Sequence, residues 1–400
     1  MCRKLLFIFP ALFLLFASLL QAKSLMLSDK AVVSILTCGP NKEIYALYGH
    51  TAIRVSDPVR NIDLAFNYGV FSFDKPNFIY RFAKGETDYL LYPYQFLDFF
   101  SGYQKDQRSV YEQVLNLTQK EKQQLFDFLI WNAREENREY RYNFFFDNCA
   151  SRVRDVVEKQ VEGEIIFPEK SDNPKTFRQL IKMYHRRDRW LNFGIDLVVC
   201  APADRFATPY EEMFLPGYLM AHFARAQIQD ENGNKPLVTE TRTLFETTLP
   251  KQSPAFSIAS PGIVFLLIVL LVVCISVCQF RKSKIPAGAD YLVYGVNGLM
   301  GLILLWFVLY SEHPAMSPNY NLVWAMPLNL LFAVVWAVKK WRPVTRWYHV
   351  FMLVWMLLFV IFGSLLPQSF HPVFYLFVLM VLSRAALHSI FVFRKKKEQD

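Results

Sequence analysis

Cys149 is the residue of this 400-residue sequence with the clearest potential for covalent chemistry. Asp147 and Asn148 precede it and are favourable helix N-cap residues, and valines recur at helical spacing behind it. We therefore expect Cys149 to open a helix, where the helix dipole and the first free amides would lower the pKa of the thiol and supply donors for an oxyanion. Cys149 is thus a candidate nucleophile, with a buried and unreactive cysteine as the alternative.

His50 is the candidate base for this nucleophile. It stands at the beginning of a predicted strand over residues 51–55, and residues 62–71 are the predicted return strand of a hairpin. The expected register puts Asn67 or Tyr68 opposite His50. Asn67 would then hold the imidazole as a third group does in catalytic triads. We predict a separation of roughly 3 to 4 Å between the imidazole and the cysteine, although a single histidine is also common as a structural residue.

The sequence patterns around Cys149 and His50 predict a domain of mixed helix and strand. Residues 31–37 and 195–199 have the pattern of strands, and a capping box at residues 118–121 precedes a predicted helix. The aromatic residues 144–146 would either line the entrance to a site or pack in the core as a strand. Residues 230–257 are polar and punctuated by proline, which indicates a strand pair or a linker.

The N-terminus has the features of an export signal. A basic head and an apolar run over residues 5–20 indicate a signal peptide within residues 1–22. Cleavage is expected near Ala22, and an uncleaved anchor is the alternative. In either case residues 23–257 are predicted to form an exported domain.

Residues 258–400 form apolar blocks with the length needed to cross a hydrocarbon core of about 30 Å. Five spans are predicted, over residues 262–280, 291–310, 322–338, 348–366 and 373–393. Lysine and arginine cluster after the first, third and fifth spans, and the two intervening loops contain none, so the C-terminus is predicted to be cytoplasmic and the exported domain to lie on the other side. This topology accounts for most of the net charge of +9, which therefore gives no reason to predict nucleic-acid binding.

The exported domain contains Cys38, Cys149 and Cys200, in a compartment where disulfides form readily. Three thiols cannot all pair, so at least one is expected to be free or to pair with another molecule, and pairing of Cys38 with Cys200 stays open. The sequence has no Cys-x-x-Cys motif and no close pair of histidines. We therefore predict no zinc site and no other cofactor.

A set of short motifs runs through the chain. They are Thr37-Cys38-Gly39-Pro40, Tyr48-Gly49-His50-Thr51-Ala52, Phe66-Asn67-Tyr68-Gly69, Tyr142-Asn143-Phe144, Asp147-Asn148-Cys149, Arg152 with Arg154-Asp155, Ala201-Pro202-Ala203-Asp204, and His313-Pro314 through Asn321-Leu322-Val323-Trp324. The order of histidine, asparagine and then cysteine resembles a circularly permuted papain-like fold of the NlpC and lecithin-retinol-acyltransferase kind. More closely, the motifs resemble the Lnb-type bacterial lipoprotein N-acyltransferases, over nearly all of the mature chain.

The resemblance implies an α+β, papain-like periplasmic domain followed by a five-helix transmembrane bundle in the bacterial inner membrane. The implied reaction moves an acyl chain from a phospholipid donor, through a thioester on Cys149, to the α-amino group of the lipidated N-terminal cysteine of a lipoprotein acceptor. His50 would act as the base, and Asn67 is the candidate third catalytic residue. Both substrates carry acyl chains in the bilayer, which gives a reason for joining the domain to a membrane bundle.

The loop after the second span, residues 312–321, is a candidate floor of the active site. The charge pattern puts it on the same side as the exported domain, and it is polar between two apolar spans. His313 and Asn321 in this loop, and Asn148 beside the nucleophile, are the candidate substrate-binding residues. An ordinary connector is the alternative for the loop.

Two other functions remain open at this point. A membrane-anchored cell-wall amidase or peptidase of the papain-like kind would use the same cysteine and histidine, although five spans are far more membrane than such a hydrolase needs. A non-enzymatic membrane receptor or transporter component is the other possibility. Against it, the predicted spans hold few charged residues, with Arg384 and His388 as the main exceptions.

Overall fold

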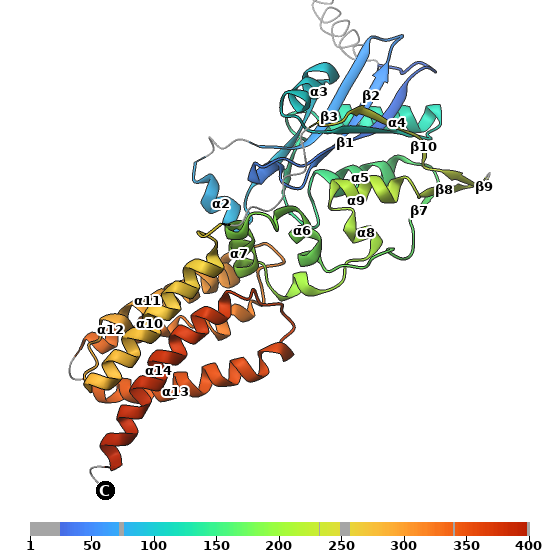
Figure 1. Ribbon diagram of the computed structural model, residues 1–400. Helices are drawn as coiled ribbons and strands as arrows, with labels where there is room; N and C mark the ends of the chain where they lie inside the picture. The colour runs from blue at the N-terminus through green and yellow to red at the C-terminus, as the bar shows by residue number, and fades with distance from the viewer. Residues whose placement is uncertain (1–24, 72–75, 232, 249–256, 339–340, 398–400) are drawn as a thin grey trace, which may run out of the picture.

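A domain built on a β-sheet comes first in the chain, and a helical domain follows it (Figure 1). The computed structural model describes residues 25–71, 76–231, 233–248, 257–338 and 341–397. The predicted signal segment, residues 1–22, lies outside the described residues. The prediction of an α+β protein that ends in a helical membrane domain is confirmed.

Within the described residues, seven strands form one antiparallel sheet in the order β10-β5-β1-β2-β3-β4-β6. They are β1 (Val32–Cys38), β2 (His50–Asp57), β3 (Ile62–Val70), β4 (Asp88–Gln95), β5 (Val110–Leu115), β6 (Glu139–Arg141) and β10 (Val238–Phe245). The three strands predicted in the N-terminal part of the sequence are β1, β2 and β3. A second sheet consists of β7 (Glu164–Ile166), β8 (Gln227–Asp230) and β9 (Gly233–Pro236).

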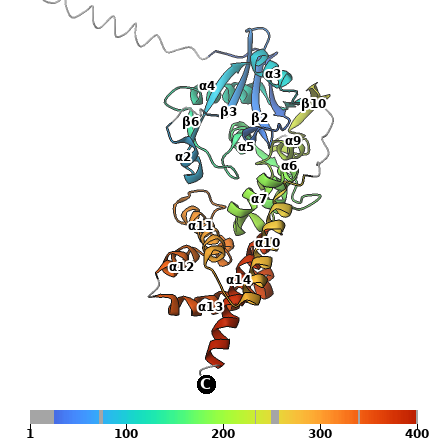
Figure 2. The same ribbon diagram turned by 60° about the vertical axis from the view of Figure 1, so that its left-hand side comes forward.

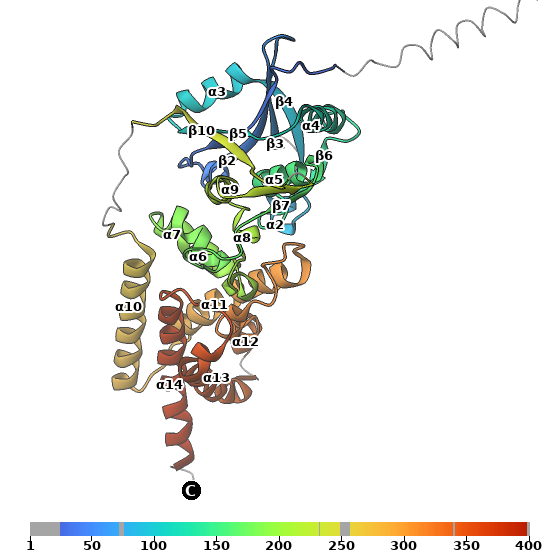
Figure 3. The ribbon, with the colours of Figure 1, turned by 90° about the vertical axis from the view of Figure 1, so that its right-hand side faces the viewer.

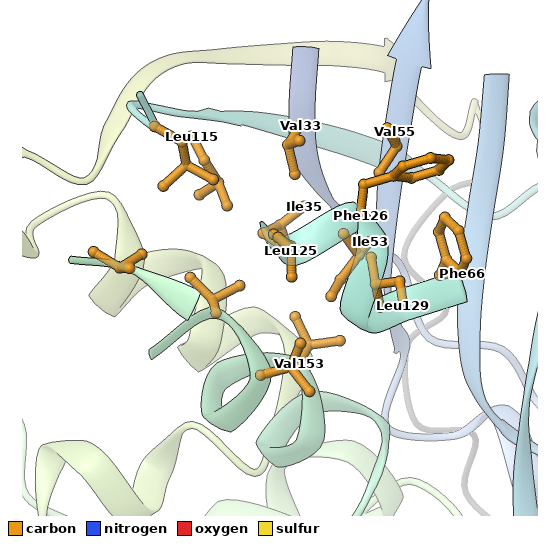
Figure 4. Close-up of a cluster of buried hydrophobic side chains, with 14 of the residues drawn as sticks. Val33, Ile35, Ile53, Val55, Phe66, Leu115, Leu125, Phe126, Leu129 and Val153 are labelled. Carbon is orange, nitrogen blue, oxygen red and sulfur yellow. The ribbon is translucent and has the colours of Figure 1, made fainter. Parts of the chain in front are cut away.

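Helix α4 (Gln119–Asn132) and helix α5 (Cys149–Gln160) pack on one face of the large sheet. Helix α4 begins with the predicted capping box at Thr118. Apolar side chains of alternate strand positions point toward the two helices, because successive residues of a strand face opposite sides. Figure 4 shows this core, with Ile35 and Ile53 of the sheet meeting Leu125 of α4 and Val153 of α5. The core fixes the position of α5, and therefore of its first residue, beneath the sheet.

The structure describes further helices in this domain. They are α2 (Phe78–Lys84), α3 (Phe96–Lys105), α6 (Phe177–His185), α7 (Arg189–Val198), α8 (Pro209–Glu212) and α9 (Pro216–Phe223), with 3-10 turns η1 (Ile44–Ala46) and η2 (Ala201–Asp204). Helix α3 packs on the opposite face of the sheet, where Phe96 and Phe99 contact Leu36 and Ala52. The predicted strand over residues 195–199 is wrong, because most of this segment belongs to α7.

The C-terminal domain contains α10 (Pro261–Lys282), α11 (Gly288–Tyr310), α12 (Leu328–Ala337), α13 (Arg342–Phe362) and α14 (Phe374–Lys397), with 3-10 turns η3 (Tyr320–Val323) and η5 (Gly363–Leu365). Among the described residues, four helices are long and apolar enough to cross a membrane, and they correspond to α10, α11, α13 and α14. Figure 2 shows these helices below the sheet domain.

The third predicted span differs from expectation. Within the described residues, the range 322–338 contains the end of η3 and the ten-residue helix α12, whose length of about 15 Å is half that of a bilayer core. Pro327 is the N-cap of α12. Helix α11 packs closely against the bend, since a Cβ atom on Gly301 would lie 2.2 Å from the carbonyl oxygen of Ala325. This span is therefore a short helix with an irregular lead-in.

The two polar residues that stood out in the predicted spans have buried partners. Arg384 donates to both carboxylate oxygens of Asp290, at 2.7 and 3.0 Å, and His388 lies 3.0 Å from the same carboxylate. Asp290 lies on α11, and Arg384 and His388 lie on α14. The pairing holds these helices together and satisfies charges that would be costly to leave alone in a bilayer.

Candidate active site

Cys149 is the first residue of α5, as predicted. Asn148 caps this helix: its side-chain oxygen accepts from the amides of Ala150 and Ser151 at 2.8 and 3.0 Å. The side-chain nitrogen of Asn148 donates to the carbonyls of Phe144 and Phe214, both at 2.8 Å. Both the oxygen and the nitrogen of the Asn148 side-chain amide thus form hydrogen bonds within the protein. This geometry gives Asn148 a role in positioning the nucleophile, and Asn148 also lines the cavity described below, so its predicted contact with substrate stays a prediction.

His50 and Asn67 form a direct contact. The Nε2 atom of His50 lies 2.5 Å from the Oδ1 atom of Asn67. Because a carbonyl oxygen only accepts hydrogen bonds, Nε2 must carry the proton and donate it. The other ring nitrogen, Nδ1, then has a free lone pair, which is the form of imidazole that acts as a base.

Gly69 lies close to both the imidazole of His50 and the side chain of Cys149. A Cβ atom added to Gly69 would lie 3.5 Å from the Cβ atom of Cys149 and 3.8 Å from the Cε1 atom of His50. The structure therefore brings together two side chains that are far apart in the sequence. Glycine is favoured at this position because its φ of +91° strains other residues.

The observed register of the hairpin differs from the predicted one. Residues Ile53 and Phe66 are paired in β2 and β3. Val55 pairs with Leu64, so the strands are shifted from the register that would put Asn67 or Tyr68 opposite His50. Strand β3 is irregular between Asn67 and Val70, and the side chains of Asn67 and His50 meet across the two strands.

Burial acts on both members of the pair. It raises the pKa of the Cys149 thiol to about 11, and it lowers the pKa of the His50 imidazole to about 4. The predicted lowering of the thiol pKa is wrong, because the loss of solvation outweighs the effect of the helix end. Near pH 7 the pair is therefore a neutral thiol beside a neutral imidazole. In this state the imidazole is able to take the proton as the sulfur attacks.

Backbone amides surround the sulfur. The amides of Thr51, Ala150 and Cys149 hydrogen-bond to the Cys149 side chain and oppose the rise of its pKa. Thr51 lies on β2 next to His50, whereas the other two belong to the start of α5. Such amides are the groups that stabilise an oxyanion when a carbonyl is attacked. The sequence predicted amide donors only at the start of the helix, whereas the structure adds the amide of Thr51 from β2.

Arg108 is a buried cation near the pair that the sequence reasoning missed. Its side chain is 7% exposed, its Nε atom donates to the carbonyl of Gly39 at 2.8 Å, and its guanidinium stacks on Tyr103 at 4.5 Å. Among the described residues, its Nη2 atom has no hydrogen-bond partner. The positive charge lowers the pKa of both His50 and Cys149. Gly39, which accepts this hydrogen bond, belongs to one of the sequence motifs, but no local pattern in the sequence connects Gly39 with Arg108.

A cavity of about 920 Å³ opens on the pair and extends toward the membrane domain. This volume lies at the upper end of the range for ligand sites, which is about 300 to 1,000 Å³. Phe144 and Phe145 line it, and they lie in a turn closed by a bridge between Asn143 and Asp147. Of the two predictions for the aromatic run, the core strand is therefore wrong, while Phe146 does not line the cavity and is 45% exposed.

Helix α7 joins the cavity to the membrane domain. Gly194 and Ile195 of this helix line the cavity, whereas Phe193 is buried among aromatic residues of the transmembrane helices. Figure 3 shows α7 between the sheet domain and the helices below it. Asn321 donates to the carbonyl of Leu197 at 2.9 Å and thereby holds the end of α7. Asn321 is fully buried and does not line the cavity, so its geometry indicates a structural role in place of the predicted contact with substrate.

The loop after α11 contributes to the same cavity. His313, Pro314 and Ala315 line it, on the side of the membrane domain. The Nε2 atom of His313 lies 2.8 Å from the carbonyl oxygen of Phe82, so the ring is held against α2. The loop therefore forms part of the wall of the cavity that contains the cysteine and histidine.

Among the described residues, Cys38, Cys149, Cys200, Cys274 and Cys278 are free thiols. The open question of pairing between Cys38 and Cys200 is thereby answered, since neither forms a disulfide in this structure. Cys200 instead donates to the carbonyl of Ala315 at 2.7 Å and holds the loop that closes the cavity. No group of three or more metal-ligating side chains occurs in the described part of the chain.

The fold and the site define a membrane protein with a candidate cysteine-dependent site in the domain that precedes its transmembrane helices. Residues 22–183 match the Lnb N-terminal periplasmic domain, and residues 252–396 match the Lnb transmembrane domain. Together the matches cover about three quarters of the chain, which is therefore an Lnb-type protein with a periplasmic N-terminal domain. Membership in this family implies a membrane enzyme of the lipoprotein N-acylation type. No curated protein and no solved structure matches the chain, and the papain-like relationship stays a prediction.

Proposed function

We propose that this protein transfers an acyl chain from a phospholipid to the α-amino group of the lipidated N-terminal cysteine of lipoproteins, through a thioester on Cys149. The observation that carries the proposal is the mainly apolar cavity that joins Cys149 and His50 to the membrane-side loop at His313. Such a cavity suits an acyl chain that reaches the sulfur from the bilayer. The bacterial inner membrane is the proposed location, with the site on its periplasmic side.

The first half of the reaction forms the thioester. His50 takes the proton of the Cys149 thiol as the sulfur attacks the ester carbonyl of the phospholipid. The amides of Thr51 and Ala150 stabilise the oxyanion. The carbon–oxygen bond of the ester then breaks, the imidazolium returns its proton to the leaving alkoxide, and a lysophospholipid departs.

The second half transfers the chain to the acceptor. The α-amine of the lipoprotein has a pKa near 8 and is partly neutral at pH 7. It attacks the thioester carbonyl, a carbon–nitrogen bond forms, and the carbon–sulfur bond breaks. His50 accepts the proton of the amine and returns it to the thiolate of Cys149. In this scheme Asn67 is the third residue, because its carbonyl oxygen keeps the proton of the imidazole on Nε2.

The position of the site relative to the bilayer supports a lipid substrate over a cell-wall peptide. Moving an acyl chain from lipid into water costs about 0.8 kcal/mol for each CH₂ group, so a site far above the membrane would face a prohibitive barrier. The cavity avoids this cost, because residues of α2, of α7 and of the loop at His313 line it on the side of the transmembrane helices. A peptidoglycan substrate would need polar groups in place of this lining.

The test is mass spectrometry of lipoprotein N-termini from cells that express the wild-type protein or the Cys149→Ala variant. We expect an added N-acyl chain only with the wild-type protein, at equal abundance of both proteins in the membrane. Unchanged lipoproteins together with altered cell-wall peptides would instead identify an amidase or peptidase. Changes in neither would favour a non-enzymatic receptor.

A further inference from the structure

Helix α2 (Phe78–Lys84) is attached to the end of a transmembrane helix. Three successive carbonyls in its last turn accept hydrogen bonds from the loop that directly follows α11. Ser311 donates to the carbonyl of Ala83 at 2.9 Å, the amide of Glu312 to that of Lys84 at 2.8 Å, and His313 to that of Phe82 at 2.8 Å. The height of α2 is therefore fixed by the point where α11 leaves the bilayer.

An aromatic cluster marks this height independently. The ring of Tyr80 on α2 lies 5.6 Å from that of Trp306 on α11, and Trp306 lies 6.2 Å from Tyr310. Tryptophan and tyrosine gather at the boundary between membrane and water, where an apolar ring with one polar group is most stable. The cluster thus indicates that α2 lies at the outer boundary of the membrane, and Figure 2 shows α2 directly above α11.

The outward side of α2 is apolar and open. Ile79 is 82% exposed and Tyr80 is 53% exposed. On α11, the helix that Tyr80 contacts through Trp306, the apolar side chain of Leu309 is 64% exposed. Because α11 is long and apolar enough to cross the membrane, its exposed apolar side chains face lipid. The exposed side chains of α2 are apolar as well, and they lie next to the end of α11.

The other side of α2 belongs to the active-site cavity. Phe78 and Phe82 line the cavity that contains Cys149 and His50. One short helix therefore separates the lipid-facing surface from the candidate site. The basic residues of α2 do not oppose this arrangement, because Arg81 pairs with Asp88 and Lys84 pairs with Glu86.

We propose that α2 lies in the outer leaflet of the membrane, with Ile79 in contact with lipid chains, and that phospholipid passes beside this helix into the cavity. The occupant of the exposed surface is thus bilayer phospholipid. The contact with lipid stands on the geometry of α2 alone, whereas the passage of a donor rests on the proposed function.

The contact is tested by placing the photoreactive residue benzoylphenylalanine at position 79 of the full-length Cys149→Ala protein in phosphatidylethanolamine vesicles. We expect phospholipid adducts at position 79, detected by mass spectrometry after illumination. Position 97 on α3 is the matched control, because Leu97 is also apolar and 73% exposed but lies on the sheet domain. Position 309 is the positive control. Adducts at 309 with none at 79, or equal adducts at 79 and 97, would overturn the proposal.

The passage of the donor is tested with Ile79→Asp, because a carboxylate resists insertion into lipid. We expect its rate to fall several-fold more with vesicle phospholipid than with a water-soluble short-chain ester, and Leu97→Asp to change neither rate. An equal fall with both donors would mean that α2 only supports the fold of the site, and no fall would mean that phospholipid takes another route. If the wild-type protein transfers no acyl chain while adducts form at position 79, the proposed function fails and the lipid contact of α2 stands.

Discussion

The Nε2 atom of His50 lies 2.5 Å from the Oδ1 atom of Asn67, and this contact determines which imidazole nitrogen is free to act as a base. The contact forms across two strands, β2 and β3, although the two residues do not face each other directly in the register. A hydrogen-bonded asparagine of this kind orients the ring and selects its tautomer without adding a charge.

Asn67→Ala should lower kcat by about 10- to 100-fold, which is part of the factor of 10² to 10⁴ that a positioned base contributes. KM for phospholipid should change little, because Asn67 does not line the cavity. The Asn67→Asp variant keeps an acceptor oxygen and should recover part of the rate. Its carboxylate should also raise the pKa of His50 and move the acid limb of the pH profile upward. A changed KM with unchanged kcat in Asn67→Ala would contradict this role.

The pH dependence follows from the lowered pKa of His50. The imidazole must be neutral to take a proton, and its neutral fraction is lost only as the pH falls through the folded pKa of about 4. The rate of lysophospholipid release in the first half-reaction should therefore stay level from pH 8 to about pH 5 and decline near pH 4. The measurement is this rate between pH 3.5 and 8 in vesicles. A decline centred near the ordinary histidine value of about 6.5 would show that burial does not govern the base.

Gly194→Phe should shorten the acyl chains that the enzyme accepts. A Cβ atom at Gly194 would have no heavy atom within 4 Å, and this residue lines the cavity. A phenyl ring can therefore occupy space that the proposal assigns to the chain. The measurement is the rate with donors of graded chain length. Gly102→Phe is the matched control, because Gly102 is also in open space but lies on α3. If the rate depended on donor chain length in the same way for both variants, the acyl chain would not bind beside Gly194.

His313→Ala should lower the activity while the protein stays at normal abundance in the membrane. The ring lines the cavity and binds the carbonyl of Phe82, so its loss loosens the contact between the loop and α2. We expect a rise in KM for phospholipid of about 10-fold, which is the effect of about 1.4 kcal/mol of binding free energy. The measurement is steady-state kinetics in vesicles. Activity equal to that of the wild-type protein would return the loop to the role of a connector.

Local signals in the sequence were sufficient for the parts of the site that depend on neighbouring residues. Asn148 as an N-cap and the spacing of Val153 behind it predicted the start of α5, which the structure has at Cys149. The capping box at Thr118 predicted α4 in the same way. The apolar, β-branched residues of β1, β2 and β3 and the turn residues between these strands were also clear signals.

Features that depend on tertiary packing were not accessible from the sequence. The segment 195–199 has an apolar run that suits a strand as well as a helix. In the structure most of it is helical, as part of α7, which packs against the transmembrane helices. Hydropathy measures composition only, so it did not detect the bend before α12. The pKa of Cys149 followed burial, which no local pattern reports. Arg108 was missed because its effect on the site acts through space.

The most direct test of the central claim is to trap the acyl group on Cys149. The purified full-length protein is incubated with phospholipid vesicles in the absence of any lipoprotein, digested, and examined by mass spectrometry. We predict an acyl mass on the peptide that contains Cys149, sensitive to hydroxylamine, absent in Cys149→Ala, and discharged when a lipoprotein with a free α-amine is added. Acyl transfer to the lipoprotein without an acylated Cys149, or undiminished transfer by Cys149→Ala, would contradict the account.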